Sequence, residues 1–510
     1  MAAFLLSYSS LPSDGQLRRI KAEACKKFKA AEFVKNADII EYLRAEKISP
    51  AKLRRLSAYL KTKHVRSLSG VSVVAIMAKP APCPGKCIYC PRGEDSPQSY
   101  TGFEPATMRA RQNRFDSFKM VSARLRQLEA IGHSPEKCEL IIMGGTFNSQ
   151  PKKYQKRFVK RAFDAFNNKP SETLQKAQKT NETAKHRVIG LTIETRPDYA
   201  SPSHVSELLS LGATRIELGV QTLDDEIYRK VNRRHTIDDV VSATRTCKDA
   251  FLKVGYHMMP GLFSSPQKDY LMFEKLFSDD RFKPDMLKIY PCLVMPGTEL
   301  FQMWKRGEYA PYYEAVAVPL LAKIKRIVPP WVRIMRIERD IPSNLIAAGI
   351  KATNLRQMVQ DFMAEKGWKC RCIRCREAGL LEKKGGKADF DSAELKRTDY
   401  EASHGKEIFL SFEDEANDAL FGFLRLRQSS NGETGVRELH VYGESLPIGA
   451  RKKGAIQHRK IGERLLREAE KISREEFDSK QLLVISGVGA RQYYRSLGYR
   501  LVEPYMAKRI

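Results

Sequence analysis

The sequence predicts an α/β protein in which a partial parallel (β/α) barrel is followed by a smaller α+β domain. Between residues 71 and 345, short β-rich runs alternate with longer helical ones, as in repeated strand–helix–strand units. From about residue 401 the pattern changes to antiparallel-looking strands and then a long helix. With a basic helical segment at the start, we expect four parts: 1–70, 71–345, a connector at 346–400, and 401–510.

Composition limits the partners and the compartment. The 510 residues include 89 Lys and Arg against 60 Asp and Glu, a formal net charge of +29, which favours polyanionic partners. The ten cysteines are not spaced like a paired extracellular framework. No apolar run approaches the roughly 18 residues that a membrane span requires. We therefore expect a cytoplasmic protein in a reducing environment.

Residues 1–70 carry fifteen Lys and Arg against six Asp and Glu. Leu53, Leu56 and Leu60 recur at three- and four-residue spacing and supply a helical packing face. A solvated helical surface is one interpretation, but so much unbalanced charge favours contact with nucleic acid phosphates. The expected RNA-binding cations are Lys26, Lys27, Arg54 and Arg55.

The central segment contains seven β-rich runs separated by helical stretches. The expected strands are Val73–Met77, Leu140–Met143, Val188–Ile193, Thr214–Val220, Val254–Met258, Met286–Tyr290 and Val332–Ile337. The expected helices are Met108–Ile131, Tyr154–Phe166, Ser203–Leu211, Asp238–Ala250 and Tyr313–Ile327. Because chemistry collects at the carboxyl ends of parallel barrel strands, polar residues that follow these runs are the candidate site.

Three cysteines, Cys83, Cys87 and Cys90, follow the first strand at C-x3-C-x2-C spacing. Three ligands leave one position of a metal centre open, whereas closed structural sites usually take four. Gly85 allows the loop to approach such a centre closely. A zinc knuckle with a distant fourth ligand and unrelated core thiols are the alternatives. The motif resembles that of radical S-adenosylmethionine (SAM) enzymes, which implies a 4Fe-4S cluster whose unique iron binds SAM.

Further strand ends carry residues that this resemblance assigns to SAM. Gly144, Gly145 and Thr146 end the second strand, where these enzymes place a glycine-rich motif against the SAM amino acid group. Glu194 and Arg196 alternate at the third strand end and so are expected to share one face, as SAM ligands or as a structural ion pair. Gln221 ends the fourth strand with a similar polar group.

From about residue 70 onward the chain resembles the catalytic subunit of the Elongator complex and its single-chain archaeal and bacterial relatives. The motifs that carry the resemblance are Ser99–Pro105, Met143–Phe147, Thr192–Tyr199, His257–Pro260, Pro329–Trp331 and Arg339–Pro342. The resemblance implies that acetyl-CoA and SAM are used to build a carboxymethyl group on carbon 5 of the wobble uridine of transfer RNA. It leaves a homodimer and additional Elongator-like subunits open.

The connector holds a second trio, Cys370, Cys372 and Cys375, at C-x-C-x2-C spacing. This is metal-ligand spacing, and it predicts a structural zinc, with a redox pair or idle thiols as alternatives. His404 is one candidate for the fourth ligand.

The last segment resembles GNAT acetyltransferases, whose Gln/Arg-x-x-Gly-x-Gly/Ala loop cradles the coenzyme A pyrophosphate before a helix. Lys460 stands where the first glycine is expected, which predicts a hindered positive φ or an added phosphate contact. By resemblance, the coenzyme contacts are Glu438, Leu439, His440, Val441, Gln457, Ile461, Gly462, Glu463 and, from the radical domain, Lys137. Tyr494 corresponds to the tyrosine near the coenzyme thiol and Tyr493 is the second candidate, a core aromatic being the alternative for each.

Two catalytic domains in one chain favour a shared intermediate. The expected catalytic residues are Tyr493, Tyr494 and Lys137, and the expected cofactors are the 4Fe-4S cluster, SAM, acetyl-CoA and zinc. A protein lysine acetyltransferase with a structural radical domain is the second hypothesis. A non-catalytic RNA-binding scaffold is the third, and only Lys460 favours it.

Overall fold

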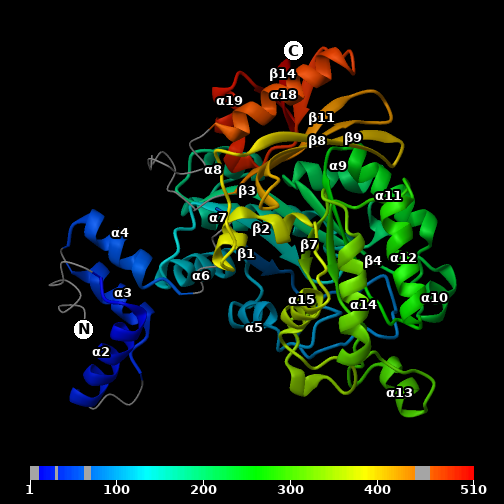
Figure 1. Ribbon diagram of the computed structural model, residues 1–510, viewed down its shortest axis with the longest axis horizontal. Coiled ribbons are helices and arrows are strands. Elements are labelled where there is room, and N and C mark those ends of the chain that lie inside the picture. Colours follow the sequence, from blue (N-terminus) through cyan, green and yellow to red (C-terminus); the bar gives the residue numbers. More distant parts are fainter. Residues whose placement is uncertain (1–10, 29–32, 47, 63–69, 443–459) are drawn as a thin grey trace.

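The computed structural model describes residues 11–28, 33–46, 48–62, 70–442 and 460–510. No helix in these ranges combines the length and the apolar character needed to cross a membrane. The basic helices at the start of the chain lie to one side of a larger body that holds two sheets (Figure 1).

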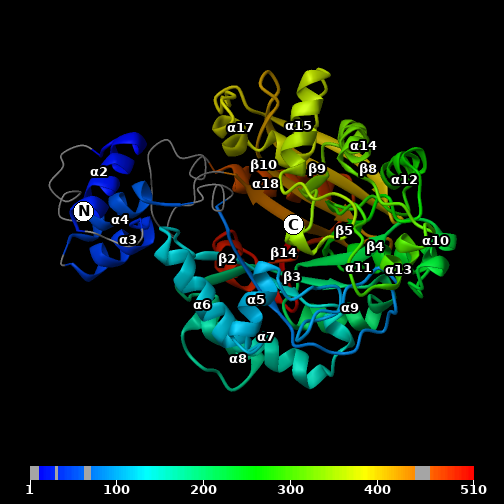
Figure 2. The same ribbon diagram turned by 90° about the horizontal axis from the view of Figure 1, so that it is seen from below.

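Three helices form the small N-terminal unit: α2 (Asp14–Lys27), α3 (Asn36–Ala45) and α4 (Pro50–Tyr59). Ser13 and Ser49 begin α2 and α4 as N-caps, each accepting a backbone hydrogen bond from the first turn. The unit stands apart from the body except beside α6 (Figures 1 and 2). It has its own apolar core, formed by Leu17, Ile39, Ile40, Leu43, Leu56 and Leu60.

The first sheet is an open parallel half-barrel of seven strands in sequence order. Its strands are β1 (Ser72–Met77), β2 (Lys137–Met143), β3 (Arg187–Thr195), β4 (Arg215–Gln221), β5 (Lys253–Met258), β6 (Met286–Ile289) and β7 (Arg333–Arg336). All seven coincide with the predicted runs, and every pairing between neighbours is parallel. Strands β1 and β7 are the two edges, so one side of the barrel stays open.

Helices cover the outside of this sheet (Figure 2). They are α5 (Pro105–Gln112), α6 (Ser117–Ala130), α7 (Lys152–Asn167), α8 (Leu174–Asn181), α9 (Pro202–Ser210), α10 (Asp225–Lys230), α11 (Ile237–Asp249), α12 (Pro266–Ser278) and α14 (Glu314–Ile327). Helix α13 (Glu299–Lys305) instead packs beside the cysteine loop, where the Leu300 nitrogen donates to the Ile88 carbonyl at 3.0 Å. The single helix predicted over 108–131 is wrong. Arg114 and Phe115 adopt left-handed φ values of 53°, and Asp116 then caps the start of α6.

The second sheet has the strand order β13-β14-β12-β11-β10-β9-β8. Its elements are β8 (Glu394–Ala402), β9 (Gly405–Asp414), β10 (Ala419–Gln428), β11 (Thr434–Val441), α18 (Ile461–Glu475), β12 (Gln481–Val484), α19 (Arg491–Ser496), β13 (Arg500–Val502) and β14 (Tyr505–Arg509). The sheet thus begins at Glu394, within the stretch predicted as connector. Before it, α15 (Leu355–Glu365), α16 (Ile373–Arg376) and α17 (Ala378–Lys383) complete the connector.

The second sheet domain packs against the amino-terminal ends of the barrel strands. Glu182, just before β3, accepts hydrogen bonds from Arg491 and Arg495 at 3.3 and 2.6 Å. Tyr505 Oη donates at 3.2 Å to the carbonyl of Ala250, three residues before the start of β5. The barrel core also includes side chains of the second domain, Leu483, Ile485, Val488 and Ala507. The cysteine loop therefore lies at the opposite end of the barrel from this interface.

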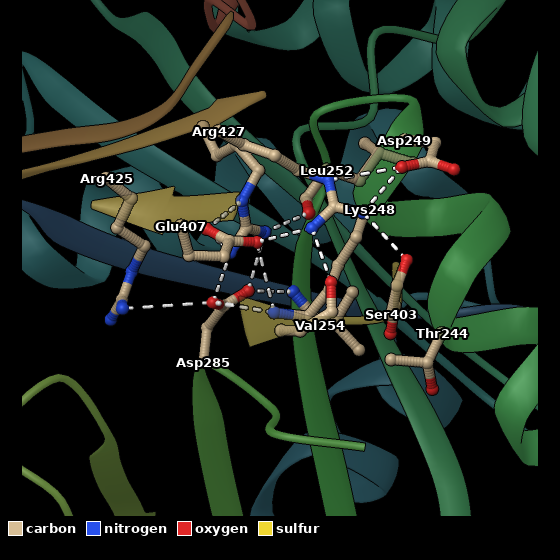
Figure 3. Close-up of polar contacts among 12 residues, drawn as sticks. Thr244, Lys248, Asp249, Leu252, Val254, Asp285, Ser403, Glu407, Arg425 and Arg427 are labelled. Carbon is tan, nitrogen blue, oxygen red and sulfur yellow. Dashed lines mark hydrogen bonds and ion pairs between the residues drawn. The ribbon is translucent and has the colours of Figure 1, made fainter. Parts of the chain in front are cut away.

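A buried ion network joins the two domains (Figure 3). Asp285, which precedes β6, accepts two hydrogen bonds from Arg437 of β11 at 2.9 and 2.5 Å. Glu407 of β9 accepts from Arg427 at 3.0 Å, from Arg437 at 3.1 Å and from Lys248 of α11 at 3.3 Å. None of these five side chains is more than 1% exposed. Buried charges persist only when paired, so the network fixes one domain against the other.

Candidate functional site

The cysteine trio lies in the loop after β1, at the carboxyl end of the barrel. Cys87 is buried, while Cys83 and Cys90 are partly buried. The Cys83 sulfur lies 3.8 Å from Thr146 Oγ1, at the end of β2. Arg233 donates to the Cys87 sulfur at 3.4 Å. A hydrogen bond from Cys90 and then the charge of Arg233 lower the pKa of Cys87 to about 4, against the opposing effect of burial.

The surroundings of the trio fit an anionic inorganic centre. Tyr89 Oη, Arg196 Nη1 and Arg233 Nε are buried polar atoms with no hydrogen-bond partner in the described part of the chain. A Cβ added to Gly85 would meet Arg196 Nη1 at 2.1 Å, so only glycine fits this turn of the loop. A thiolate-bound cluster supplies sulfur acceptors to such donors. The residues present therefore fit a 4Fe-4S cluster.

The predicted SAM residues lie at or beside one cavity, with the exception of Arg196. Gly145, Thr146, Glu194 and Gln221 line one cavity at the carboxyl strand ends. Glu194 accepts from Lys288 at 3.0 Å and from Tyr100 Oη at 3.2 Å. Gly144 adopts a φ of +117°, and a Cβ there would lie 3.2 Å from the Ala78 nitrogen.

The sequence pattern predicts that Arg196 and Glu194 share one face. The structure differs, because β3 ends at Thr195 and Arg196 does not line the cavity. Its guanidinium forms a two-point ion pair with Asp198 at 2.9 Å and donates to the Arg233 carbonyl at 2.8 Å. The ion pair that the sequence offers as the alternative for Glu194 and Arg196 is not formed between these two described residues, because Arg196 pairs with Asp198 and Glu194 pairs with Lys288.

Sequence reasoning missed the contacts that His257 and Lys288 make inside the barrel. His257 Nε2 lies 2.9 Å from a Glu217 oxygen, and Lys288 forms a very close ion pair with the same carboxylate. Burial raises the pKa of Glu217, but Lys288, His257 and Arg215 more than offset this and hold it well below its usual value. The position of His257 and Lys288 at the ends of β5 and β6 was the available signal.

The second cysteine trio forms a compact group. The sulfurs of Cys370, Cys372 and Cys375 all lie within 4.8 Å of one another, and Lys325 donates to Cys375 at 3.5 Å. Three close thiols fit a zinc ion. His404 is an exposed turn residue with a φ of 61° and is not a member of the group that the described residues form.

The residues that the sequence predicts as coenzyme contacts lie on β11 and at the start of α18. Strand β11 pairs with β12 only from Thr434 to Val436, so the edge of β11 beyond Val436 lies free of this partner. The residues expected to contact the coenzyme arm, Glu438, Leu439, His440 and Val441, follow on this edge. Gln457 lies outside the described residues.

At the start of α18, Lys460 adopts the left-handed conformation with a φ of 57°. The lysine therefore reaches the positive φ that the glycine pattern requires, at a cost of about 1–2 kcal/mol. Ile461 and Gly462 are buried in the first turn, and Glu463 pairs with Arg467 at 2.5 Å. The first turn of a helix presents backbone amides of the kind that anions bind.

The two candidate tyrosines lie in different environments. A Cβ added to Gly462 would come within 2.8 Å of Tyr493 Oη, so the Tyr493 side chain lies against the first turn of α18. Tyr494 is only 7% exposed and packs in the second core beside Tyr499. The geometry places Tyr493, rather than Tyr494, beside the proposed coenzyme loop.

The remaining predicted residues lie away from the lumen. Lys137 is the first residue of β2, and its backbone is in register with that of Arg187 on β3, at the barrel end that the second domain covers. Burial lowers its pKa. Lys26, Lys27 and Arg55 are exposed on α2 and α4, while the side chain of Arg54 lies outside the description.

One cavity of about 930 Å³ connects the two ends of the barrel. Cys83, Cys87 and Cys90 line one end of it, and Glu438, Leu439, His440 and Tyr442 line the other. The lumen between them is lined by inward-facing strand residues such as Glu139, Arg215, Lys253 and Met286. This cavity brings the cysteine trio and the edge of β11 into one compartment.

The sequence matches two family profiles that define the class of protein. Residues 82–274 match the radical SAM superfamily, and residues 284–365 match the radical SAM C-terminal domain. The chain is thus a radical SAM protein, as its half-barrel and cysteine loop indicate.

Similar proteins narrow this class to one family. The tRNA uridine(34) acetyltransferase of Methanocaldococcus infernus is 49% identical over 93% of this chain and 91% of its own length. The human Elongator complex protein 3 is 41% identical over 97% and 93%. The solved structure of the M. infernus Elp3 lacking residues 1–46 superposes with a TM-score of 0.77, at 45% identity over 87% of this chain and 100% of that one. The chain belongs to the Elp3 family.

Proposed function

We propose that this protein modifies the wobble uridine of transfer RNA, using SAM and acetyl-CoA to build a carboxymethyl group on carbon 5. The observation that carries the proposal is the single cavity between the cysteine trio and the free edge of β11. Reactions that share an intermediate require their sites to face a common, water-restricted space. Family membership supports the same activity, because the named relatives include tRNA uridine(34) acetyltransferases.

In this proposal Cys83, Cys87 and Cys90 hold the cluster, and Arg233 and Tyr89 face it as hydrogen-bond donors. When bound, the cluster and SAM supply hydrogen abstraction from an unactivated carbon. The strand ends with Gly145, Thr146, Glu194 and Gln221 orient SAM. The Glu194 carboxylate, fixed by Lys288 and Tyr100, is a hydrogen-bond acceptor for a ligand amine or hydroxyl.

The acetyl donor occupies the second domain. The free backbone groups of β11 pair with the amides of the coenzyme arm, and the first turn of α18 binds its pyrophosphate. Tyr493 and Lys137 are the candidate residues for contact with the coenzyme from the two domains, and the buried position of Tyr494 supports a structural role for it. Exposed cations of α2 and α4 contact transfer RNA phosphates. Zinc at the Cys370 group stabilises the connector.

The decisive experiment is anaerobic reconstitution with transfer RNA, SAM, acetyl-CoA and a reductant, followed by nucleoside mass analysis. We expect carboxymethylated uridine that depends on both cofactors. A Cys83→Ala variant should give no product, because the trio then lacks one ligand. Acetylated protein without any change in uridine mass would instead support the lysine acetyltransferase hypothesis and contradict this proposal.

A further inference from the structure

The cavity that joins the two domains is strongly basic. Eleven Lys and Arg residues line it against six Asp and Glu residues. Several of these cations form ion pairs with a carboxylate. The pairs are Lys288 with Glu194, Arg336 with Asp340, and Arg215 with Glu139. An excess of buried positive charge is unfavourable unless an anion offsets it. The surplus therefore marks where an anionic group of a ligand binds.

The surplus concentrates on the wall formed by β7 and the connector, where Arg333, Arg356 and Arg374 line the cavity. Arg333 is satisfied by Glu377 at 2.9 Å and by Tyr442 Oη at 2.6 Å. Among the described residues, Arg356 donates only to the Ile334 carbonyl, at 3.4 Å, and its buried Nη1 has no partner there.

Arg374 forms no hydrogen bond or ion pair with any residue in the described ranges. Glu377, the carboxylate three positions further along the chain, is engaged by Arg333 at 2.9 Å. Arg374 lines the same cavity as Arg356 and Arg333, so the three guanidinium groups border one part of the lumen. The adjacent thiols do not supply a free counter-charge, because they form the candidate zinc site and already contact Lys325.

We propose that Arg374 and Arg356 form a phosphate-binding site in the wall of the cavity, and that it takes a backbone phosphodiester of the RNA strand whose base enters the lumen. Guanidinium groups match phosphate oxygens with two parallel hydrogen bonds, which suits this pair of unsatisfied donors. The site borders β7, an open edge of the half-barrel, whereas the proposed coenzyme turn lies at α18. This inference rests on the proposed function, since it assigns a contact to the transfer RNA substrate.

The test compares Arg374→Gln with Arg371→Gln in the full-length protein. Arg371 is a matched control in the same segment, because its side chain is 61% exposed and reaches only Asp418, at 4.0 Å. Binding of a transfer RNA transcript is measured by fluorescence anisotropy across a series of salt concentrations. For Arg374→Gln we expect about a tenfold weaker affinity at low salt and a log–log salt slope smaller by about 0.7, the loss of one phosphate contact. Arg371→Gln should behave like the wild type.

Further measurements separate the outcomes. Metal analysis of each variant shows whether the neighbouring thiols still bind zinc. The variant Arg374→Lys keeps the charge but loses the two parallel guanidinium hydrogen bonds, so it should retain the wild-type salt slope and bind transfer RNA with reduced affinity. If Arg374→Gln weakens coenzyme A binding and leaves RNA binding unchanged, the phosphate belongs to the coenzyme and the RNA assignment is overturned. Unchanged affinity for both ligands overturns the site itself. A wild-type protein that binds no transfer RNA would contradict the proposed function instead.

Discussion

Replacing Asp285 by Asn should destabilise both domains together. Asp285 has no exposed surface, and its carboxylate accepts two hydrogen bonds from Arg437 and one from the Val254 nitrogen at 2.8 Å. The amide of Asn keeps the size but removes the charge, leaving Arg437 with Glu407 as its only carboxylate partner. Breaking a buried ion pair in this way costs about 3–5 kcal/mol, and the retained amide oxygen places this variant near 3 kcal/mol.

Urea unfolding at neutral pH tests this prediction with two signals. Trp304 and Trp368 precede the second sheet and follow the barrel side and the connector, whereas Trp331 stacks on Tyr400 of β8 at 4.3 Å and follows the contact between the domains. Circular dichroism follows both domains. Both midpoints should fall together. The control Asp399→Asn removes an exposed partner of Arg397 and should leave them unchanged. A loss of less than about 1 kcal/mol, or a shift confined to one signal, would refute the reasoning.

The same network predicts the pH dependence of stability. Despite burial, Arg437 and Lys248 hold the pKa of Asp285 far below its usual value, so its contribution is present above about pH 4 and is lost as the pH falls further. The advantage of the wild type over Asp285→Asn should therefore shrink in acid. Burial lowers the pKa of Lys248 to about 8, so the native state binds fewer protons than the unfolded chain between about pH 8 and 10.4. Stability from this group should rise across that interval.

Three other changes test the proposed sites. Cys87→Ser should abolish the iron–sulfur absorbance and retain zinc, whereas Cys372→Ser should lose zinc and retain the iron–sulfur absorbance. Metal analysis that finds both metals in both variants would contradict the two assignments. Reversing the charges of Lys26 and Lys27 should weaken transfer RNA binding and reduce the salt slope by about 1.4, and an unchanged slope would exclude the α2 surface. Gly462→Ala should weaken coenzyme A binding in calorimetry, because the added methyl meets the neighbouring tyrosine hydroxyl, and wild-type affinity would move the coenzyme elsewhere.

The strands were predictable because buried β-rich runs between helices have few other interpretations. The break between α5 and α6 was not, since neither Gly nor Pro marks it and Arg114 simply adopts a left-handed conformation. Strand β8 was missed because it is an edge strand with alternating exposed charges, which resembles a polar connector.

Motif spacing located the cysteine groups and the glycine strand end, because these are local in sequence. Pairings across the fold could not be found in this way. Asp285 and Arg437 lie 152 positions apart, and His257 meets Glu217 only because β4 and β5 are neighbours in the barrel. The conformation of Lys460 was also open, because a lysine can occupy a left-handed position at modest cost.

The buried ion network between the two domains also limits the routes by which large ligands can reach the lumen. A hinge motion that separates Arg437 from Asp285 would cost about 3–5 kcal/mol, so fewer than about 1% of molecules would be hinged open at any moment. Large ligands therefore have to reach the lumen without this motion, and the unpaired edge strands β1 and β7 are one place where the cavity has no neighbouring strand. Val73 on one edge and Met335 on the other both line the cavity, and Val73 is 42% exposed. For the proposed function, we therefore expect the RNA strand to enter beside these edge strands, because the domain interface stays closed.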